Sequence, residues 1–307
     1  MTRLILGRLA EALAALLLMS LAIFLLSRVT GDPVALLLGD GATAEDRDLL
    51  IAQLRLDRPL WEQYLSFLGN ALTGDFGQSV AAGRRDALEL VLDRLPASLS
   101  LAAVALGFTL VTGIAMGVVA AITRGSAVDV FVRIVALLGQ SVPAFWLGIV
   151  LIYVVAVHWG WLPTSGYGTP AHYVLPALTM GTFTLAAVTR LVRASMLDAL
   201  GSEYIKLARI KGLPEATVIL KHALSNSLIP VVTFMGAFFA TMITGAVVVE
   251  TVFAWPGIGR LAYESIVSRD FPVIQTVVLV ITACFILANF CVDMLYLAID
   301  PRMRDRG

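Results

Sequence analysis

The sequence predicts an all-α integral membrane protein with six transmembrane helices. Hydrophobic residues make up 59% of the 307-residue chain and charged residues 14%, and the mean hydropathy is +0.87. This composition is far from that of a soluble domain. A transmembrane helix needs about 20 mostly apolar residues. Six such windows lie near residues 9–29, 97–122, 132–157, 174–195, 226–250 and 274–299.

The first window follows Arg3 and Arg8, as the core of a signal peptide would. Its apolar run is too long for a signal peptide, and no small-residue cleavage site follows it. Residues 1–30 are therefore predicted to be an N-terminal transmembrane helix. Glu11 is interpreted as a membrane-interface residue near Arg8.

Residues 31–95 separate the first two windows and have mixed charge. The segment from Asp57 to Leu68 has apolar residues at helical spacing with Pro59 near its start, which predicts a short helix. A Gly-rich run, residues 74–79, follows. We expect an outward cap, or a landing surface for an external protein; the alternative is a packed loop that only stabilises the outer face.

The distribution of basic residues predicts that both termini face the cytoplasm. Of the 22 Lys and Arg residues, 13 fall on the side that holds the termini. The opposite loop from His158 to Tyr173 has none. Because Lys and Arg concentrate in cytoplasmic loops, the tail 300–307 and the loop 198–225 are also expected to be cytoplasmic.

The loop 198–225, between the fourth and fifth windows, is predicted to be a handle for a partner outside the bilayer. Gly212 is predicted to end a helix in a left-handed conformation, and Leu213-Pro214 to start another. Two short helices at that corner would form a compact knob that fits a cleft. The knob combines apolar and charged side chains: Glu203, Tyr204, Ile205, Lys206, Leu207, Ala208, Arg209 and Lys211.

Motifs of enzymes are absent from the sequence. It has no Gly-rich Lys-Ser/Thr phosphate loop, no HExxH and no GxSxG, so we expect no catalytic residues and no ATP hydrolysis by this chain. Three histidines and two cysteines predict no metal site. The segment from Thr164 to Gly168 is similar to a potassium filter, but it has no room for a preceding pore helix.

Polar and small residues inside the windows have structural interpretations. Asn289 and Asp293 lie four residues apart, hence on one helix face, and Asp293 is expected to pair with an arginine as a structural clamp. Proton coupling is the alternative. Gly107, Thr112, Gly113 and Gly117 are expected to let helices approach closely.

The inward loop resembles the EAA loop of binding-protein-dependent ABC importer permeases. Ala208, Gly212 and Leu224 match that signature, whereas Lys206 replaces its Glu and Ser225 its Pro. This version fits the dipeptide, oligopeptide and nickel group. The resemblance continues in ordered segments over nearly the whole chain: Gly31-Asp32-Pro33, Leu56 to Pro59, Gly74 to Ser79, Leu95 to Ser98, Val249 to Gly259, Arg269 to Gln275 and Asp300-Pro301-Arg302.

The resemblance implies a scoop-bearing permease: a helix at 1–30, a scoop at 31–95, a five-helix core at 96–299 with the coupling loop 198–225, and a tail at 300–307. It implies a bacterial inner-membrane protein that works with a second permease, two ATPases that bind ATP and Mg²⁺, an external substrate-binding protein and lipid, but no nucleic acid. No cofactor is expected in this chain. The residues expected to contact the ATPase are Glu203, Tyr204, Ile205, Lys206, Ala208, Arg209 and Gly212.

The expected cargo is dipeptides or oligopeptides. Nickel, as a chelate, and glutathione-like small peptides remain alternatives within the same architecture, and an ion channel or secondary transporter is a more distant one. No residue of the sequence is assigned to the substrate pathway.

Overall fold

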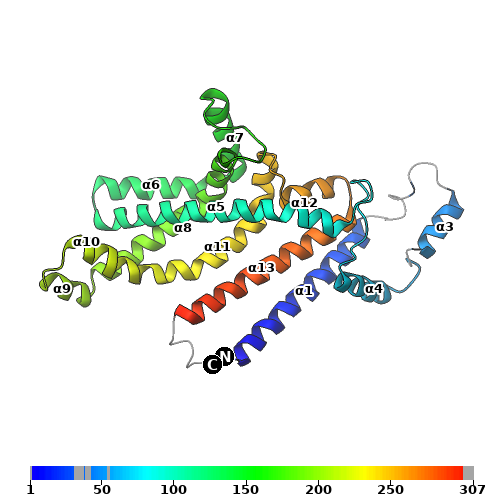
Figure 1. The fold of residues 1–307 in the computed structure, drawn as a ribbon, viewed down its shortest axis with the longest axis horizontal. Helices are drawn as coiled ribbons and strands as arrows, with labels where there is room; N and C mark the ends of the chain where they lie inside the picture. Colours follow the sequence, from blue (N-terminus) through cyan, green and yellow to red (C-terminus); the bar gives the residue numbers. More distant parts are fainter. Residues whose placement is uncertain (1, 31–37, 39–42, 54–55, 300–307) are drawn as a thin grey trace. The chain divides into compact units, whose positions relative to one another are not determined.

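The computed structural model describes residues 2–30, 38, 43–53 and 56–299 and contains no β-strand within them. The predicted motifs Gly31-Asp32-Pro33 and Asp300-Pro301-Arg302 lie outside the described residues. The elements, coloured along the chain in Figure 1, are α1 (Thr2–Thr30), α3 (Ala44–Gln53), α4 (Leu60–Thr73), α5 (Ala87–Ile122), α6 (Ala127–Ser141), α7 (Ala144–Leu151), the π-helix η1 (Ile152–His158), α8 (Pro170–Leu200), α9 (Glu203–Ile210), α10 (Glu215–Thr217), the π-helix η2 (Val218–Ala223), α11 (Leu224–Val252), α12 (Ile258–Val267) and α13 (Phe271–Ile299).

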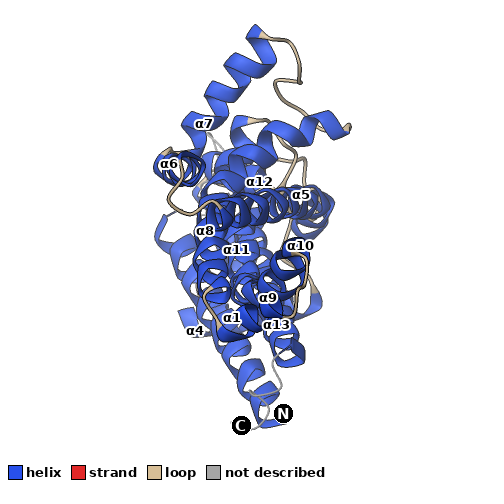
Figure 2. Ribbon diagram, turned by 90° about the vertical axis from the view of Figure 1, so that its left-hand side faces the viewer, coloured by secondary structure: helices blue, strands red, loops and turns tan. Residues whose placement is uncertain are grey.

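Five helices of the described chain are long and apolar enough to cross a membrane, and the bent pair formed by α6 with α7 and η1 gives a sixth if it counts as one span. The predicted single helix over 132–157 is therefore corrected to a broken one, with a bend of 106°. Figure 2 shows α7 turning away from α6. Pro143 explains the break, since it has no N–H for the helix and forces Val142 into an extended conformation.

The chain divides into two compact units, and α12 with most of α13 groups with α1 in the first. Within this unit, α4 begins after Pro59, as the sequence predicts, and ends at Gly74 in a left-handed conformation. Tyr64 of α4 bonds to Ser20 of α1 at 2.9 Å. The Ser79 hydroxyl donates to the buried Asp270 carboxylate, which joins the Gly-rich run to the segment before α13.

The second unit contains the described residues 97–256 and the end of α13. In it α8 packs against α6, α7 and α11. Gly113 and Gly117 allow the close approach of α5 and α8 that was expected, because a Cβ on Gly117 would lie 2.6 Å from the Cβ of Val192. Gly107 has no such role, since nothing lies within 4 Å of the position its Cβ would take.

Candidate functional site

The candidate site is the corner formed by α9 and the start of the next helix. Ser202, in an extended conformation, precedes α9, and Glu203 places an acid in its first turn. Gly212 has φ +77°, so the left-handed conformation that the sequence predicts is confirmed. The N–H of Leu213 donates to the carbonyl of Ala208 at 3.3 Å, and the backbone is thereby closed across the corner.

Only one short helix forms here. Pro214 precedes α10, as the helix start at Leu213-Pro214 predicts, but α10 runs without interruption through η2 into α11. The predicted pair of short helices is therefore corrected to one short helix, α9, followed by the first turn of a long one. Figure 1 shows α9 and α10 at the ends of α8 and α11.

One face of α9 is buried inside its own unit. Ile205 is completely buried and Ala208 nearly so, in a cluster with Val192 and Met196 of α8 and Val218 of η2. The expected contact of Ile205 and Ala208 with a partner is corrected accordingly, because both side chains already pack against this chain. They join α9 to α8 and to the start of the α11 helix.

The other face of α9 is exposed and partly apolar. Ile210 keeps 82% of its surface exposed, and Tyr204 and Leu207 are also exposed. Exposed aliphatic and aromatic side chains that alternate with charges are typical of a protein contact surface. We call this set, Tyr204, Leu207 and Ile210, the exposed α9 face.

Ion pairs flank the corner. The Arg209 guanidinium donates to both carboxylate oxygens of Glu215, at 3.2 and 2.6 Å, and therefore spans the corner at Gly212. This hydrogen bonding raises the pKa of Arg209. Lys206 pairs with Glu203 at 2.8 Å. Both pairs are solvent-exposed, so they orient the side chains more than they stabilise the fold.

Sequence reasoning missed a buried ion pair between α6 and α8. Both oxygens of the Asp129 carboxylate accept from Arg193, at 2.8 Å each, and one also accepts from the N–H of Gly125 at 3.1 Å. The available signal was Ser126 three residues before Asp129, a helix-start pattern that the structure realises. The pair fixes the first turn of α6 against α8.

A second missed constellation surrounds Glu250 near the end of α11. Glu250 is fully buried and accepts from the Ser98 hydroxyl of α5 at 2.5 Å. The Trp255 indole N–H donates to the carbonyl of Ala97 at 3.0 Å, and its ring packs edge-on against Tyr167 and Tyr173. These contacts hold α5, α8 and α11 together. The resemblance includes the segments Leu95 to Ser98 and Val249 to Gly259, but no spacing within either segment predicts that they pair.

Asn289 and Asp293 lie on α13, and the Asn289 side chain is half-buried. The side chain of Asp293 lies outside the described residues, so its arginine partner stays a prediction. Among the residues that the structure describes, no group of three or more His, Cys, Asp or Glu could hold a metal ion.

Two family models match the chain. Residues 113–305 match the binding-protein-dependent transport system inner membrane component, and residues 1–102 match the N-terminal part of such a membrane component. The chain belongs to the ABC importer permeases of the peptide and nickel group. This permease is thus the membrane-spanning subunit of an importer and a multi-pass inner-membrane protein.

The chain is also similar, over nearly its whole length, to permeases that have been named. It is 41% identical over 301 residues, 98% of each chain, to the glutathione transport system permease protein GsiC of Escherichia coli (strain K12) and to that of Shigella dysenteriae serotype 1 (strain Sd197).

Solved structures share the fold. The inward-facing MetNI methionine ABC transporter (CY5 native crystal form) matches with a TM-score of 0.58 at 20% identity, over 69% of this chain and 96% of that one. An amino acid ABC transporter with histidines matches with a TM-score of 0.52 at 16% identity, over 70% and 94%.

Proposed function

We propose that this permease forms half of the pathway for short peptides, with glutathione as the first cargo to test, in an ATP-driven importer. The observation that carries the proposal is the 41% identity to glutathione permeases over 98% of both chains. Glutathione is itself a small peptide, so the expected peptide cargo and the glutathione alternative describe one substrate class. Nickel remains the second candidate only through membership of the group.

The proposed partners are a second permease, two ATPase subunits that bind ATP and Mg²⁺, and an external substrate-binding protein. Both termini and α9 are proposed to face the cytoplasm. The exposed α9 face would contact an ATPase groove, because Tyr204, Leu207 and Ile210 are the apolar side chains of α9 that remain exposed.

The buried face of α9 supplies the proposed route for coupling. Ile205 and Ala208 share one cluster with Val188, Val192 and Met196 of α8. A displacement of α9 by the ATPase would therefore move α8 with it, since a packed cluster transmits displacement with little compression.

Reconstitution of the whole complex tests the proposal. We expect this chain to co-purify from native membranes with a second permease and two ATPases, and the complex in proteoliposomes to accumulate labelled glutathione or trialanine when ATP and the loaded binding protein are present. Recovery of the chain alone, or uptake of a nickel chelate without peptide uptake, would overturn it.

A further inference from the structure

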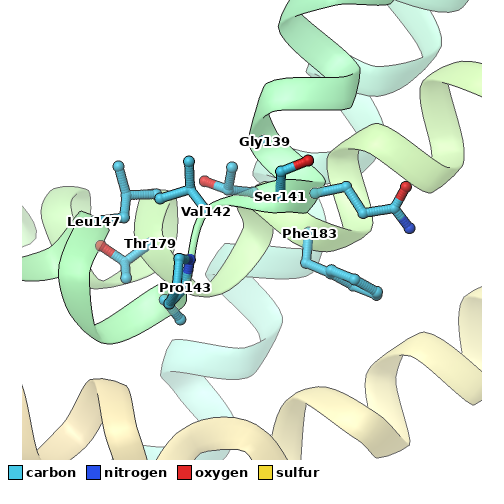
Figure 3. Close-up of a pocket in the computed structure, with 10 residues that line it drawn as sticks. Gly139, Ser141, Val142, Pro143, Leu147, Thr179 and Phe183 are labelled. Atoms are coloured by element: carbon cyan, nitrogen blue, oxygen red, sulfur yellow. The ribbon is translucent and has the colours of Figure 1, made fainter.

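A cavity of about 340 Å³ lies at the break between α6 and α7. It is bounded by residues 139–144 and Leu147 on one side and by Thr179, Thr182 and Phe183 of α8 on the other, all within the second unit. Figure 3 shows these side chains around the break. Neither the sequence pattern nor the similarity to other permeases assigns a role to it.

The local sequence explains why the cavity forms there. Pro143 ends the α6 helix, and because it has no N–H it leaves the Gly139 carbonyl, four residues earlier, without its usual helical donor. Gly139 also brings α6 close to α8, since a Cβ at this position would lie 2.9 Å from Cγ2 of Thr182. The bend then takes α7 away from α6.

The polar side-chain atoms of the lining residues are uncharged and are mostly acceptors. The hydroxyls of Ser141, Thr179 and Thr182 each donate their hydrogen to a carbonyl one helical turn earlier in their own helix. Their oxygen lone pairs remain available to accept. The Gln140 side-chain amide adds one more acceptor and two donors, and the Phe183 ring adds an exposed apolar surface.

We propose that this cavity is a substrate-contact site of the translocation pathway, which binds the N–H groups of a short peptide through Gln140, Ser141 and Thr182. The inference rests on the proposed function and deepens it. Neutral acceptors match the amide and ammonium donors of a peptide without selecting the charge of its side chains. The volume lies within the range of small-molecule sites, about 300 to 1,000 Å³.

The test uses the complete complex in proteoliposomes with the loaded binding protein, and S-methylglutathione and trialanine as cargo. Thr182→Val keeps the side-chain shape and removes the acceptor oxygen, and Gln140→Leu removes the amide. Thr123→Val is the matched control, because Thr123 makes the same hydroxyl bond to a carbonyl four residues earlier but does not line the cavity.

We expect peptide uptake per ATP hydrolysed to fall about threefold to tenfold for Thr182→Val and Gln140→Leu, as expected for the loss of one or two hydrogen bonds. Hydrolysis stimulated by the loaded binding protein should stay near wild type, because docking and the exposed α9 face are intact. If Thr182 and Gln140 had only a structural role, their substitution would lower uptake per ATP and stimulated ATP hydrolysis together. Thr123→Val should match wild type.

A direct measurement uses Ser141→Cys in a background with Cys284→Ala and Cys291→Ala. S-methylglutathione, which has no free thiol, should protect this cysteine from maleimide. Unchanged uptake per ATP in both variants together with no protection would overturn the site while leaving the proposed function standing. Absence of peptide uptake by the wild type would instead overturn the proposed function.

Discussion

Two bends of the chain in the second unit differ in how they are held. The corner at Gly212 is closed by a backbone bond from Leu213 and by the Arg209–Glu215 pair, with Ile205 packed beneath it. At the break at Pro143 no ion pair between described residues crosses the bend, and a cavity lies beside it. The corner at Gly212 is therefore held rigid by its own contacts. The break at Pro143 instead leaves space in which a ligand could bind.

The largest expected effect distinguishes the two faces of α9. Ile205→Asp should destabilise the permease by several kcal/mol, because it buries an unpaired charge in a packed cluster. Ile210→Asp is the matched control for folding, since its side chain is 82% exposed. Thermal unfolding of the detergent-purified complex measures both. Equal melting temperatures of Ile205→Asp and Ile210→Asp would show that the face of α9 that contains Ile205 is not buried.

A smaller effect is expected at the break. Gly139→Ala should cost about 1 to 3 kcal/mol, because its Cβ would overlap Cγ2 of Thr182 and force α6 away from α8. Gly107→Ala serves as the control, as it also adds a methyl group to a helix but meets nothing within 4 Å. If the two variants unfold at the same temperature, the close approach of α6 and α8 is wrong.

Gly212→Ala should cost about 1 kcal/mol, purely from backbone strain at φ +77°. No atom of the described residues lies within 4 Å of the position of the added methyl group, so the methyl group itself meets no clash. The expected signature is a modest fall in the melting temperature with a larger fall in uptake per ATP, because the orientation of α9 changes. Gly69→Ala, within α4 and equally open, should leave uptake per ATP unchanged and raise the melting temperature slightly, because Ala favours a helix interior over Gly.

The smallest effect is expected for Arg209→Ala. Its partner Glu215 is exposed, so the melting temperature should change less than in Gly212→Ala. Loss of the Arg209–Glu215 pair should still lower peptide uptake per ATP hydrolysed. High salt should lower uptake per ATP in the wild type toward the value of the variant, because salt screens the pair. Wild-type uptake per ATP in Arg209→Ala at low salt would show that the corner does not need the Arg209–Glu215 pair.

These bends also show how far the sequence predicts the structure. Gly212 and Pro59 act through their own backbone geometry, so a local pattern was enough to predict a helix end and a helix start. Pro143 carries the same kind of signal, but the apolar run around it favours one continuous helix over 132–157.

The remaining features depend on contacts between distant residues. Ile205 and Ile210 are both apolar positions of one short helix, and only the packing of α8 decides which of them is buried. Asp129 and Arg193 are 64 positions apart, and Ser98 and Glu250 are 152 apart, so no local spacing could pair them. The cavity likewise requires α8 to lie beside the break.

The exposed α9 face is proposed to contact an ATPase subunit. The most direct measurement is photo-cross-linking in native membranes from a benzophenone side chain placed at Ile210, with the same group at Trp161, exposed in the loop between η1 and α8, as the control. We predict a covalent product between position 210 and an ATP-binding subunit, and none from position 161. No such product from position 210, or the same product from both positions, would show that the exposed α9 face is not the contact with the ATPase.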